Sequence, residues 1–226
     1  MRGSLQSVAL LCTLLIWAGC AASYLASASE GHVPWCVPHL QGCDSVSATG
    51  RHGWGYFLFK AFVLPAAGLL WFYWLLCAAW LEALDASAGL RHSILIIGQV
   101  SAVALVLYVT FLGSEGDVYR ALRRYGTVVY FGGTYLTQLL LLKALRDLAV
   151  DPPFVRFLSW LAVLMLVGAA SFAVVANLFP EEDVLQNISE WNFGTLLCAF
   201  PALTWWLWRR QDVRLEVEPG LSARRS

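Results

Sequence analysis

Residues 56–81 read YFLFKAFVLPAAGLLWFYWLLCAAWL and contain a single charged side chain, Lys60. A helix that crosses the hydrocarbon core of a bilayer needs about 20 predominantly apolar residues. The whole chain has the matching composition: 59% of its 226 residues are hydrophobic and 13% are charged, against roughly 45–50% and about 25% in a soluble domain. Its eleven Trp and eight Tyr residues favour the headgroup region of a membrane. The stretch therefore predicts a transmembrane helix of an integral membrane protein.

Six apolar stretches in all predict transmembrane helices. The polar segments between them carry turn and charge signals, and none is long enough to link two independent domains. Because the apolar runs are continuous rather than alternating, helices are favoured over a β-barrel. We therefore expect an all-α fold in which residues 1–226 form one polytopic bundle, with six helices over 8–25, 56–81, 93–112, 127–145, 157–179 and 193–208.

The distribution of Lys and Arg predicts the orientation of this bundle, since cytoplasmic loops carry an excess of these residues. With the N-terminus in the cytoplasm, ten basic residues fall on the cytoplasmic side and five on the outer side. The pair Arg209–Arg210 directly follows a Trp-rich stretch and indicates a cytoplasmic anchor. We expect both termini in the cytoplasm, an outer loop over 29–53 and a cytoplasmic tail over 209–226.

The first stretch allows a second interpretation. Arg2 precedes the apolar residues 8–16, and the run then reaches Trp17-Ala18-Gly19-Cys20, as in a cleaved secretory or lipoprotein signal. However, Trp17 stands where a lipobox has an aliphatic residue, and the apolar character continues to Leu25. We expect an uncleaved helix. An intact mass that lacks the first nineteen residues would contradict the six-helix prediction.

Charge and cysteine content exclude several functional classes. The formal net charge is zero and no long basic run occurs, so no nucleic-acid partner is expected. The four histidines and six cysteines show no metal-binding spacing, and we expect no metal or other cofactor. Cys36 and Cys43 share the outer loop, where the surroundings permit a disulfide. The other cysteines lie singly in apolar stretches and are expected to act as small hydrophobic residues: Cys12, Cys20, Cys77 and Cys198.

The outer loop continues as Ser45-Val46-Ser47-Ala48-Thr49-Gly50, just before the second apolar stretch. Its hydroxyls and its flexible glycine suggest a headgroup-binding or ligand-binding site at the membrane surface, formed by Ser45, Ser47, Thr49 and Gly50. The alternative is a disulfide-pinned cap in which these hydroxyls only bond backbone groups of the loop. The sequence leaves both interpretations open.

A basic cluster precedes the fourth apolar stretch. We expect residues 118–125 to form a short interfacial helix, in which Arg120, Arg123 and Arg124 have i, i+3, i+4 spacing and share one face. Three arginines on one face suit a lipid phosphate. The alternatives are ion pairs with the acidic residues of segment 181–190, or plain exposure to solvent as rim charges.

Four polar side chains fall inside apolar stretches or at their edges: Lys60, Gln99, Gln138 and Asn177. Polar groups at this depth usually face the interior of the bundle. We expect Lys60 to extend toward the outer interface and Gln138 to hydrogen bond to a neighbouring helix.

The run Cys43-Asp44-Ser45-Val46-Ser47-Ala48-Thr49-Gly50, followed by Phe57-Leu58-Phe59-Lys60, resembles the signature of one membrane-protein family. That family groups the damage-regulated autophagy modulators (DRAM), the Frag proteins and the yeast suppressor-of-four-kinase (Sfk) proteins. Its pattern is an outer loop with an Ile/Val-Ser-x-Thr-Gly motif after helix one, and then five more helices. Residues 118–126 and 188–191 are also similar. Members often carry Pro after the Thr-Gly motif, where this chain has Gly53 or Trp54, so the resemblance selects no subfamily.

The resemblance implies a role in lipid handling, because branches of the family are associated with lipid remodelling of GPI anchors, with phosphoinositide and sterol organisation, and with autophagy. It carries no catalytic residue over to this chain. We expect a non-enzymatic protein that binds or organises membrane lipids through its outer loops, with membrane lipids and a membrane protein as candidate partners. The alternative is a lipid-modifying enzyme that remodels acyl chains with outer-loop groups: His39, Asp44, Ser45, Ser47 and His52.

Overall fold

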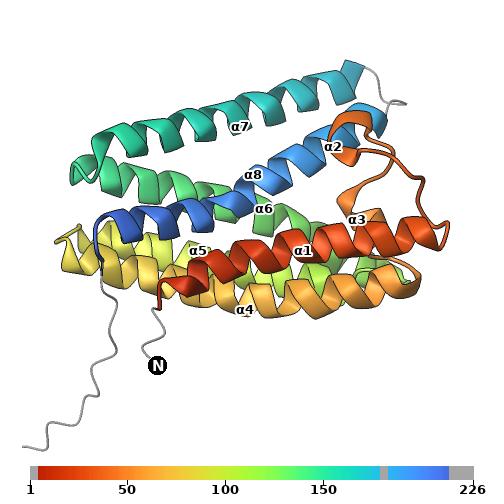
Figure 1. Cartoon of the computed structure of the whole chain (residues 1–226), viewed down its shortest axis with the longest axis horizontal. Coiled ribbons are helices and arrows are strands. Elements are labelled where there is room, and N and C mark those ends of the chain that lie inside the picture. Colours follow the sequence, from red (N-terminus) through yellow and green to blue (C-terminus); the bar gives the residue numbers. More distant parts are fainter. Residues whose placement is uncertain (1–4, 179–182, 214–226) are drawn as a thin grey trace, which may run out of the picture.

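The computed structural model of the protein describes residues 5–178 and 183–213, and the regular secondary structure of these residues is entirely helical (Figure 1). The all-α prediction is therefore confirmed for this part of the chain. The side chain of Asn177, the predicted helix end at 179 and the tail beyond 213 lie outside the described residues. The helices are α1 (Ser7–Ser29), α2 (Pro38–Gln41), α3 (Val46–Thr49), α4 (Gly53–Ala83), α5 (Ala88–Thr110), α6 (Asp117–Asp147), α7 (Pro152–Leu178) and α8 (Asp183–Arg210).

Five of the described helices are long and apolar enough to cross a membrane: α1, α4, α5, α6 and the Pro152–Ala170 part of α7. They make this a multi-pass membrane protein. The predicted stretches 8–25, 56–81 and 127–145 lie within α1, α4 and α6, whereas 93–112 extends two residues beyond the end of α5 and 157–179 begins inside α7. The sixth stretch, 193–208, lies inside α8. Its apolar part is interrupted by Pro201 and flanked by Glu190 and by Arg209 and Arg210, and its crossing of the membrane stays a prediction.

One local prediction is wrong. Residues 118–125 do not form a separate interfacial helix, because they are the first turns of the continuous 31-residue helix α6. The packing of α6 on α5 explains the continuity. A Cβ added to Gly126 would lie 3.0 Å from the carbonyl oxygen of Ala104 and 3.0 Å from the backbone nitrogen of Tyr108. Such close backbone approach through a small residue is common between membrane helices, and here it holds the start of α6 against α5.

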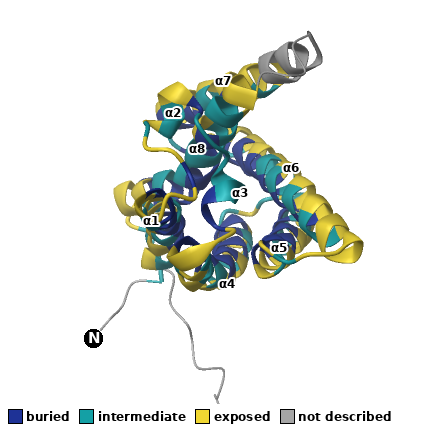
Figure 2. Ribbon diagram, turned by 90° about the vertical axis from the view of Figure 1, so that its right-hand side faces the viewer, coloured by how far each residue is buried: buried dark blue, intermediate teal, exposed yellow. Residues whose placement is uncertain are grey.

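Four of the long helices form an arc. Seen end-on in Figure 2, α1, α4, α5 and α6 follow one another in chain order, and each packs against the next. Helix α8 lies between the two ends of the arc and contacts α1 and α6, while α7 packs on the outer side of α8. The two short helices, α2 and α3, belong to the connection between α1 and α4 and lie at one end of the bundle (Figure 1).

Helix α8 crosses this arc obliquely (Figure 1). Its C-terminal end is buried in the centre, where the Trp208 ring lies 6.1 Å from Tyr73 and 5.7 Å from Trp80 of α4. The Thr204 hydroxyl also meets the Tyr73 hydroxyl at 2.9 Å. Its N-terminal half leans instead on α2. The interior of the bundle is therefore filled at one end by α8 and left for other groups at the end that carries α2 and α3.

Pro201 lies where the two halves of α8 meet. Proline has no backbone N–H, so the carbonyl four residues earlier, that of Leu197, lacks its usual helical donor. The amide of Gln138 from α6 fills this place, since its Nε2 donates to the Leu197 oxygen at 2.9 Å. The prediction that Gln138 bonds across helices is confirmed.

Lys60 binds groups near the start of α4 and the end of α5. Its Nζ donates to the Tyr56 hydroxyl and, at 2.9 Å, to the carbonyl oxygen of Thr110 at the end of α5. The ammonium group lies 3.8 Å from the centre of the Tyr56 ring, a favourable cation–π distance. The side chain thus extends toward the end of the bundle that carries α2 and α3, and its charge is bound by groups of that end.

Candidate functional site

Residues 34–50 form a folded cap at one end of the bundle. The Cys36–Cys43 disulfide, which the sequence predicted, closes a short loop around α2. The Tyr24 hydroxyl of α1 bonds to the backbone of this loop. It accepts the Cys36 N–H at 2.7 Å and donates to the Cys36 carbonyl oxygen at 2.9 Å. The cap is therefore fixed both to itself and to α1.

Side chains of α8 hold the other side of the cap. They recur on one face of the helix, and three of them donate to cap carbonyl groups. The amide of Asn187 donates to Gly42, the indole N–H of Trp191 donates to Asp44, and the amide of Asn192 donates to His39, each at 2.9 Å. One helical turn further on, Thr195 Oγ1 lies 2.9 Å from Nε2 of His39. These bonds join segments of the chain that are about 150 residues apart.

The predicted residues Ser45, Ser47, Thr49 and Gly50 lie together in α3 and its flanks. Ser45 Oγ accepts the N–H of Ala48 at 3.1 Å and so caps the first turn of α3. The Ser47 hydroxyl accepts from the Arg51 guanidinium at 2.9 Å, and the buried Thr49 hydroxyl donates to the Val46 carbonyl oxygen at 2.8 Å. The structure thus places all three hydroxyls in contacts within the protein.

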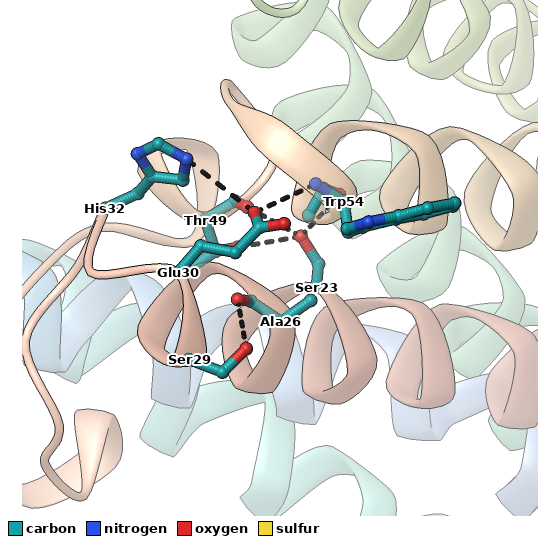
Figure 3. A network of polar contacts seen from close by, with 8 residues as sticks. Ser23, Ala26, Ser29, Glu30, His32, Thr49 and Trp54 are labelled. Atoms are coloured by element: carbon teal, nitrogen blue, oxygen red, sulfur yellow. Dashed lines mark hydrogen bonds and ion pairs between the residues drawn. The ribbon is translucent and has the colours of Figure 1, made fainter.

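A polar network ties this loop to α1 and α4 (Figure 3). The buried Ser23 hydroxyl lies between the carbonyl oxygens of Thr49 and Gly55, at 2.8 and 2.9 Å. Nearby, the Glu30 carboxylate accepts the backbone N–H of Trp54 at 2.9 Å and lies 3.6 Å from the His32 ring nitrogen. Both connections fix the start of α4 beneath the cap.

The predicted basic cluster is separate from this loop. Arg120 and Arg124 are exposed and Arg123 is half-buried, all in the first turns of α6. Arg120 lies 3.6 Å from the Asp117 carboxylate, and both groups are largely exposed to solvent. Among the residues that the structure describes, no hydrogen bond or ion pair joins these arginines to residues 45–50. Direct polar contacts therefore do not join the two predicted groups of site residues in the described part of the chain.

An apolar cavity of about 350 Å³ lies beneath the cap. It occupies the space that the inclined α8 leaves in the bundle, and α3 lies over the centre of the arc in Figure 2. Its volume is in the range of small-molecule sites. The walls come from seven helices and include Ile16 and Cys20 of α1, His39 of α2, Val46 of α3, Phe59 and Val63 of α4, Leu105 and Tyr108 of α5, Tyr130 and Phe131 of α6, and Trp191, Gly194, Thr195 and Cys198 of α8.

Few polar groups reach this cavity. Tyr108 is 5% exposed, and its hydroxyl makes no hydrogen bond with any residue in the described part of the chain. The Tyr130 hydroxyl lies 3.4 Å from the Cys198 sulfur. His39 and Thr195 bond each other in the wall. A ligand in this space would therefore meet apolar walls and a single free phenol group.

Two titratable groups lie where the cap meets α8: His39 of α2 and Glu190 near the start of α8. Burial lowers the pKa of His39 from its ordinary value, which favours the neutral ring that bonds Thr195. Burial raises the pKa of Glu190, while the backbone N–H of Ser47 and the Arg51 guanidinium act in the opposite direction. The interface of cap and α8 therefore favours neutral groups.

The residues of the enzyme alternative are distributed over different contacts. His39 bonds Thr195, whereas the His52 ring packs 5.5 Å from the His32 ring. Within residues 5–178 and 183–213, neither His39 nor His52 hydrogen bonds to Asp44, Ser45 or Ser47. In the same described residues, no group of three or more His, Cys, Asp or Glu side chains is arranged to hold a metal ion.

The sequence did not predict the cavity or the few polar residues in its walls, among them Tyr108, Tyr130 and Thr195. The available signal was the position of the two tyrosines, which lie inside apolar stretches rather than only at the ends where aromatic belts occur. The chain matches no protein-family profile, no curated protein and no solved structure.

Proposed function

We propose that this chain is a non-enzymatic membrane protein of the Frag/DRAM/Sfk type that binds a membrane lipid in the cavity beneath its cap. The apolar part of the lipid lies in the cavity, and its polar part lies next to the cap and the outer loops. In this proposal α8 is the sixth transmembrane helix, both termini are cytoplasmic, and the cap is on the outer side of the membrane. The lipid is held and organised rather than chemically changed.

The observation that carries this proposal is the cavity itself. Apolar cavities of only about 150 Å³ bind hydrocarbon molecules such as benzene, and this one measures about 350 Å³. Hydrocarbon is favoured there because polar molecules would lose hydrogen bonds on entry. The free hydroxyl of Tyr108 adds one polar contact, which suits a lipid that carries a hydroxyl or ester oxygen close to its apolar part.

A cavity-filling variant tests the proposal. Gly194 lines the cavity, and a Cβ there would meet only the Phe131 ring, at an ordinary contact distance of 3.8 Å. We expect Gly194→Leu to abolish the lipid that co-purifies with the full chain and is detected by native mass spectrometry. The matched control is Gly132→Leu on α6, where a Cβ meets nothing within 4 Å. Equal lipid retention in the two variants, with both folded, would contradict the proposal.

The proposed orientation has its own support and test. A disulfide in the cap is favoured on the outer, oxidising side, which agrees with the Lys and Arg distribution. Ser87 precedes α5 and Ser114 follows it, at opposite ends of that helix. A membrane-impermeant maleimide added to intact cells should label Ser114→Cys and not Ser87→Cys. The reverse labelling would overturn the orientation.

One observation favours the enzymatic alternative as a second candidate. A hydroxyl and an imidazole within hydrogen-bond distance are the minimum pair for nucleophilic attack, and Thr195 and His39 meet at 2.9 Å in the cavity wall. If the chain cleaves or transfers an acyl group, Thr195→Val and His39→Gln each abolish product formation from a membrane lipid. The non-enzymatic proposal predicts that the wild-type chain forms no such product.

A further inference from the structure

A groove between α6 and α7 lies at the opposite end of the bundle from the cap (Figure 1). It follows the turn that joins the two helices and measures about 510 Å³. Its walls are apolar along most of their length, but Arg146 of α6 and Arg156 and Ser159 of α7 also line it. Two cationic groups thus face one small space.

The positive charges of Arg146 and Arg156 are not neutralised by an acidic side chain in the described part of the chain. Arg146 Nη2 donates to the Ser159 hydroxyl at 2.9 Å. Arg156 precedes Ser159 by three residues, on the same face of α7, and lines the same groove. Neither arginine forms an ion pair with a residue that the structure describes.

Two acidic side chains close to the turn between α6 and α7 already have basic partners. Asp147 binds Lys143 within α6, and Asp151 lies 3.5 Å from Arg210 of α8. The groove therefore combines two positive charges with one hydroxyl, and no carboxylate lines it.

An apolar channel continues from the charged end. It measures about 250 Å³ and shares Arg146, Ser159 and Val163 with the first part. Its other lining residues are Tyr135, Leu139, Leu142, Ala162, Leu166 and Lys143, whose ammonium group is paired with Asp147. The Tyr135 hydroxyl donates to the Ala162 carbonyl oxygen at 2.8 Å. A molecule that fills both parts must carry a negative charge at one end and hydrocarbon at the other.

We propose that this groove binds an anionic phospholipid from the membrane leaflet at that end of the bundle. The phosphate lies between Arg146 and Arg156, where guanidinium groups donate to its oxygens in pairs, and it accepts from the Ser159 hydroxyl. One acyl chain follows the channel along α6 and α7. Trp160 lies beside the charged end and is 68% exposed, which places an indole at the headgroup level.

This site goes beyond the proposed function, since it shares no lining residue with the cavity beneath the cap. It resembles the basic pockets between membrane helices that recognise anionic lipids. Loss of lipid from the cavity in Gly194→Leu leaves binding in the groove unchanged, and loss of binding in the groove leaves the cavity lipid in place. The two proposals can therefore fail separately.

The first test compares charge variants of the full chain in detergent, by native mass spectrometry with phosphatidylglycerol and with phosphatidylcholine. We expect the wild-type chain to prefer phosphatidylglycerol, and Arg146→Gln and Arg156→Gln each to weaken its binding about fivefold. The matched control is Arg209→Gln, which removes one charge at the same end, where Arg209 lies over the Trp205 ring and does not line the groove. An equal effect of Arg209→Gln would show attraction to surface charge in general and would overturn the site.

The second test separates a whole phospholipid from a free phosphate. Val163 lines both parts of the groove and is 48% exposed, so Val163→Trp can block the channel while both arginines stay. We expect this variant to lose phosphatidylglycerol binding at least as strongly as Arg156→Gln, with an unchanged melting temperature. Binding of inorganic phosphate as tight as that of the lipid, or lipid binding unaffected by Val163→Trp, would overturn the proposal.

Discussion

Thr13 of α1 and Cys198 of α8 are joined by a hydrogen bond of 2.7 Å, from the Thr13 hydroxyl to the Cys198 carbonyl oxygen. The same hydroxyl accepts the backbone N–H of Ala202 at 3.2 Å. An uninterrupted helix would pair this carbonyl with this N–H. The side chain of α1 therefore bridges the backbone groups on either side of Pro201, and it holds α8 at the position where its direction across the bundle is set.

Replacing Thr13 by valine removes this bridge and leaves buried backbone groups of α8 without their partner. We expect Thr13→Val to reduce the free energy of unfolding by about 1 kcal/mol, the usual size of a buried hydrogen bond between membrane helices. A lower melting temperature in detergent would show it. Thr127→Val is the matched control, because the Thr127 hydroxyl bonds only the Arg123 carbonyl oxygen of its own helix. The interpretation fails if both variants lose the same stability.

Reduction of the Cys36–Cys43 disulfide should loosen the cap without unfolding the bundle. The bridge spans a sequence separation of seven residues, and closing so short a loop stabilises by about 2 kcal/mol. The bonds from Tyr24 and Trp191 to the cap remain. Hydrogen exchange should therefore become faster in residues 34–50 after reduction and stay unchanged in α5. Faster exchange throughout the bundle would contradict a local role.

The bond between His39 and Thr195 should make stability depend on pH. Burial lowers the pKa of His39, so the unfolded chain takes up a proton more readily than the folded one. This contribution to stability is fully present above the unfolded pKa of about 6.5 and is lost as the pH falls through the folded pKa. The melting temperature of the wild type should fall relative to His39→Asn between about pH 7 and about pH 5. A constant difference between the two proteins would refute this.

Glu190 should act in the opposite direction. Burial raises its pKa, against the influence of the Ser47 backbone N–H and of Arg51, so the folded state binds a proton more readily than the unfolded one. Its ionisation therefore destabilises the fold as the pH rises, and the stability gained from protonation is complete only below the unfolded pKa of about 4.3. We expect Glu190→Gln to raise the melting temperature at neutral pH, with a gain that shrinks toward about pH 4. No gain at neutral pH would contradict it.

Gly98 should be intolerant of any side chain. A Cβ at this position would lie 2.4 Å from the Trp74 ring, which is fully buried, so Gly98→Ala must displace the ring or separate α4 from α5. We expect a loss of about 1–3 kcal/mol of stability. Gly89→Ala in the same helix is the control, because a Cβ there meets nothing within 4 Å and alanine favours the helix. Equal melting temperatures of the two variants would rule out the close packing.

Much of the fold was predictable because a bilayer imposes a length on each crossing helix. The apolar runs located five spans, and the loop position of Cys36 and Cys43 predicted their disulfide. The helix ends were not predictable from hydropathy. Helix α6, for example, begins at Asp117, ten residues before the apolar stretch 127–145, because α6 packs closely on α5 at Gly126, before that stretch begins.

The cavity could not be predicted from local pattern. It depends on the inclination of α8, which is fixed by contacts such as Asn187 with Gly42, 145 residues apart. The hydroxyls of residues 45–49 lie close together, and their partners lie on α1, on Arg51 and in their own loop. No sequence spacing reveals such partners.

The bonds between the cap and α8 have a consequence for the order of assembly. During synthesis the cap leaves the ribosome with the first third of the chain, whereas Asn187, Trp191 and Thr195 follow only after five apolar helices have been made. Until then the carbonyl groups of Gly42 and Asp44 lack these partners, and the cavity has no wall on that side. Arrival of α8 should therefore be the step that completes both the cap and the cavity, and a chain stopped before residue 183 should remain a target for quality-control proteolysis.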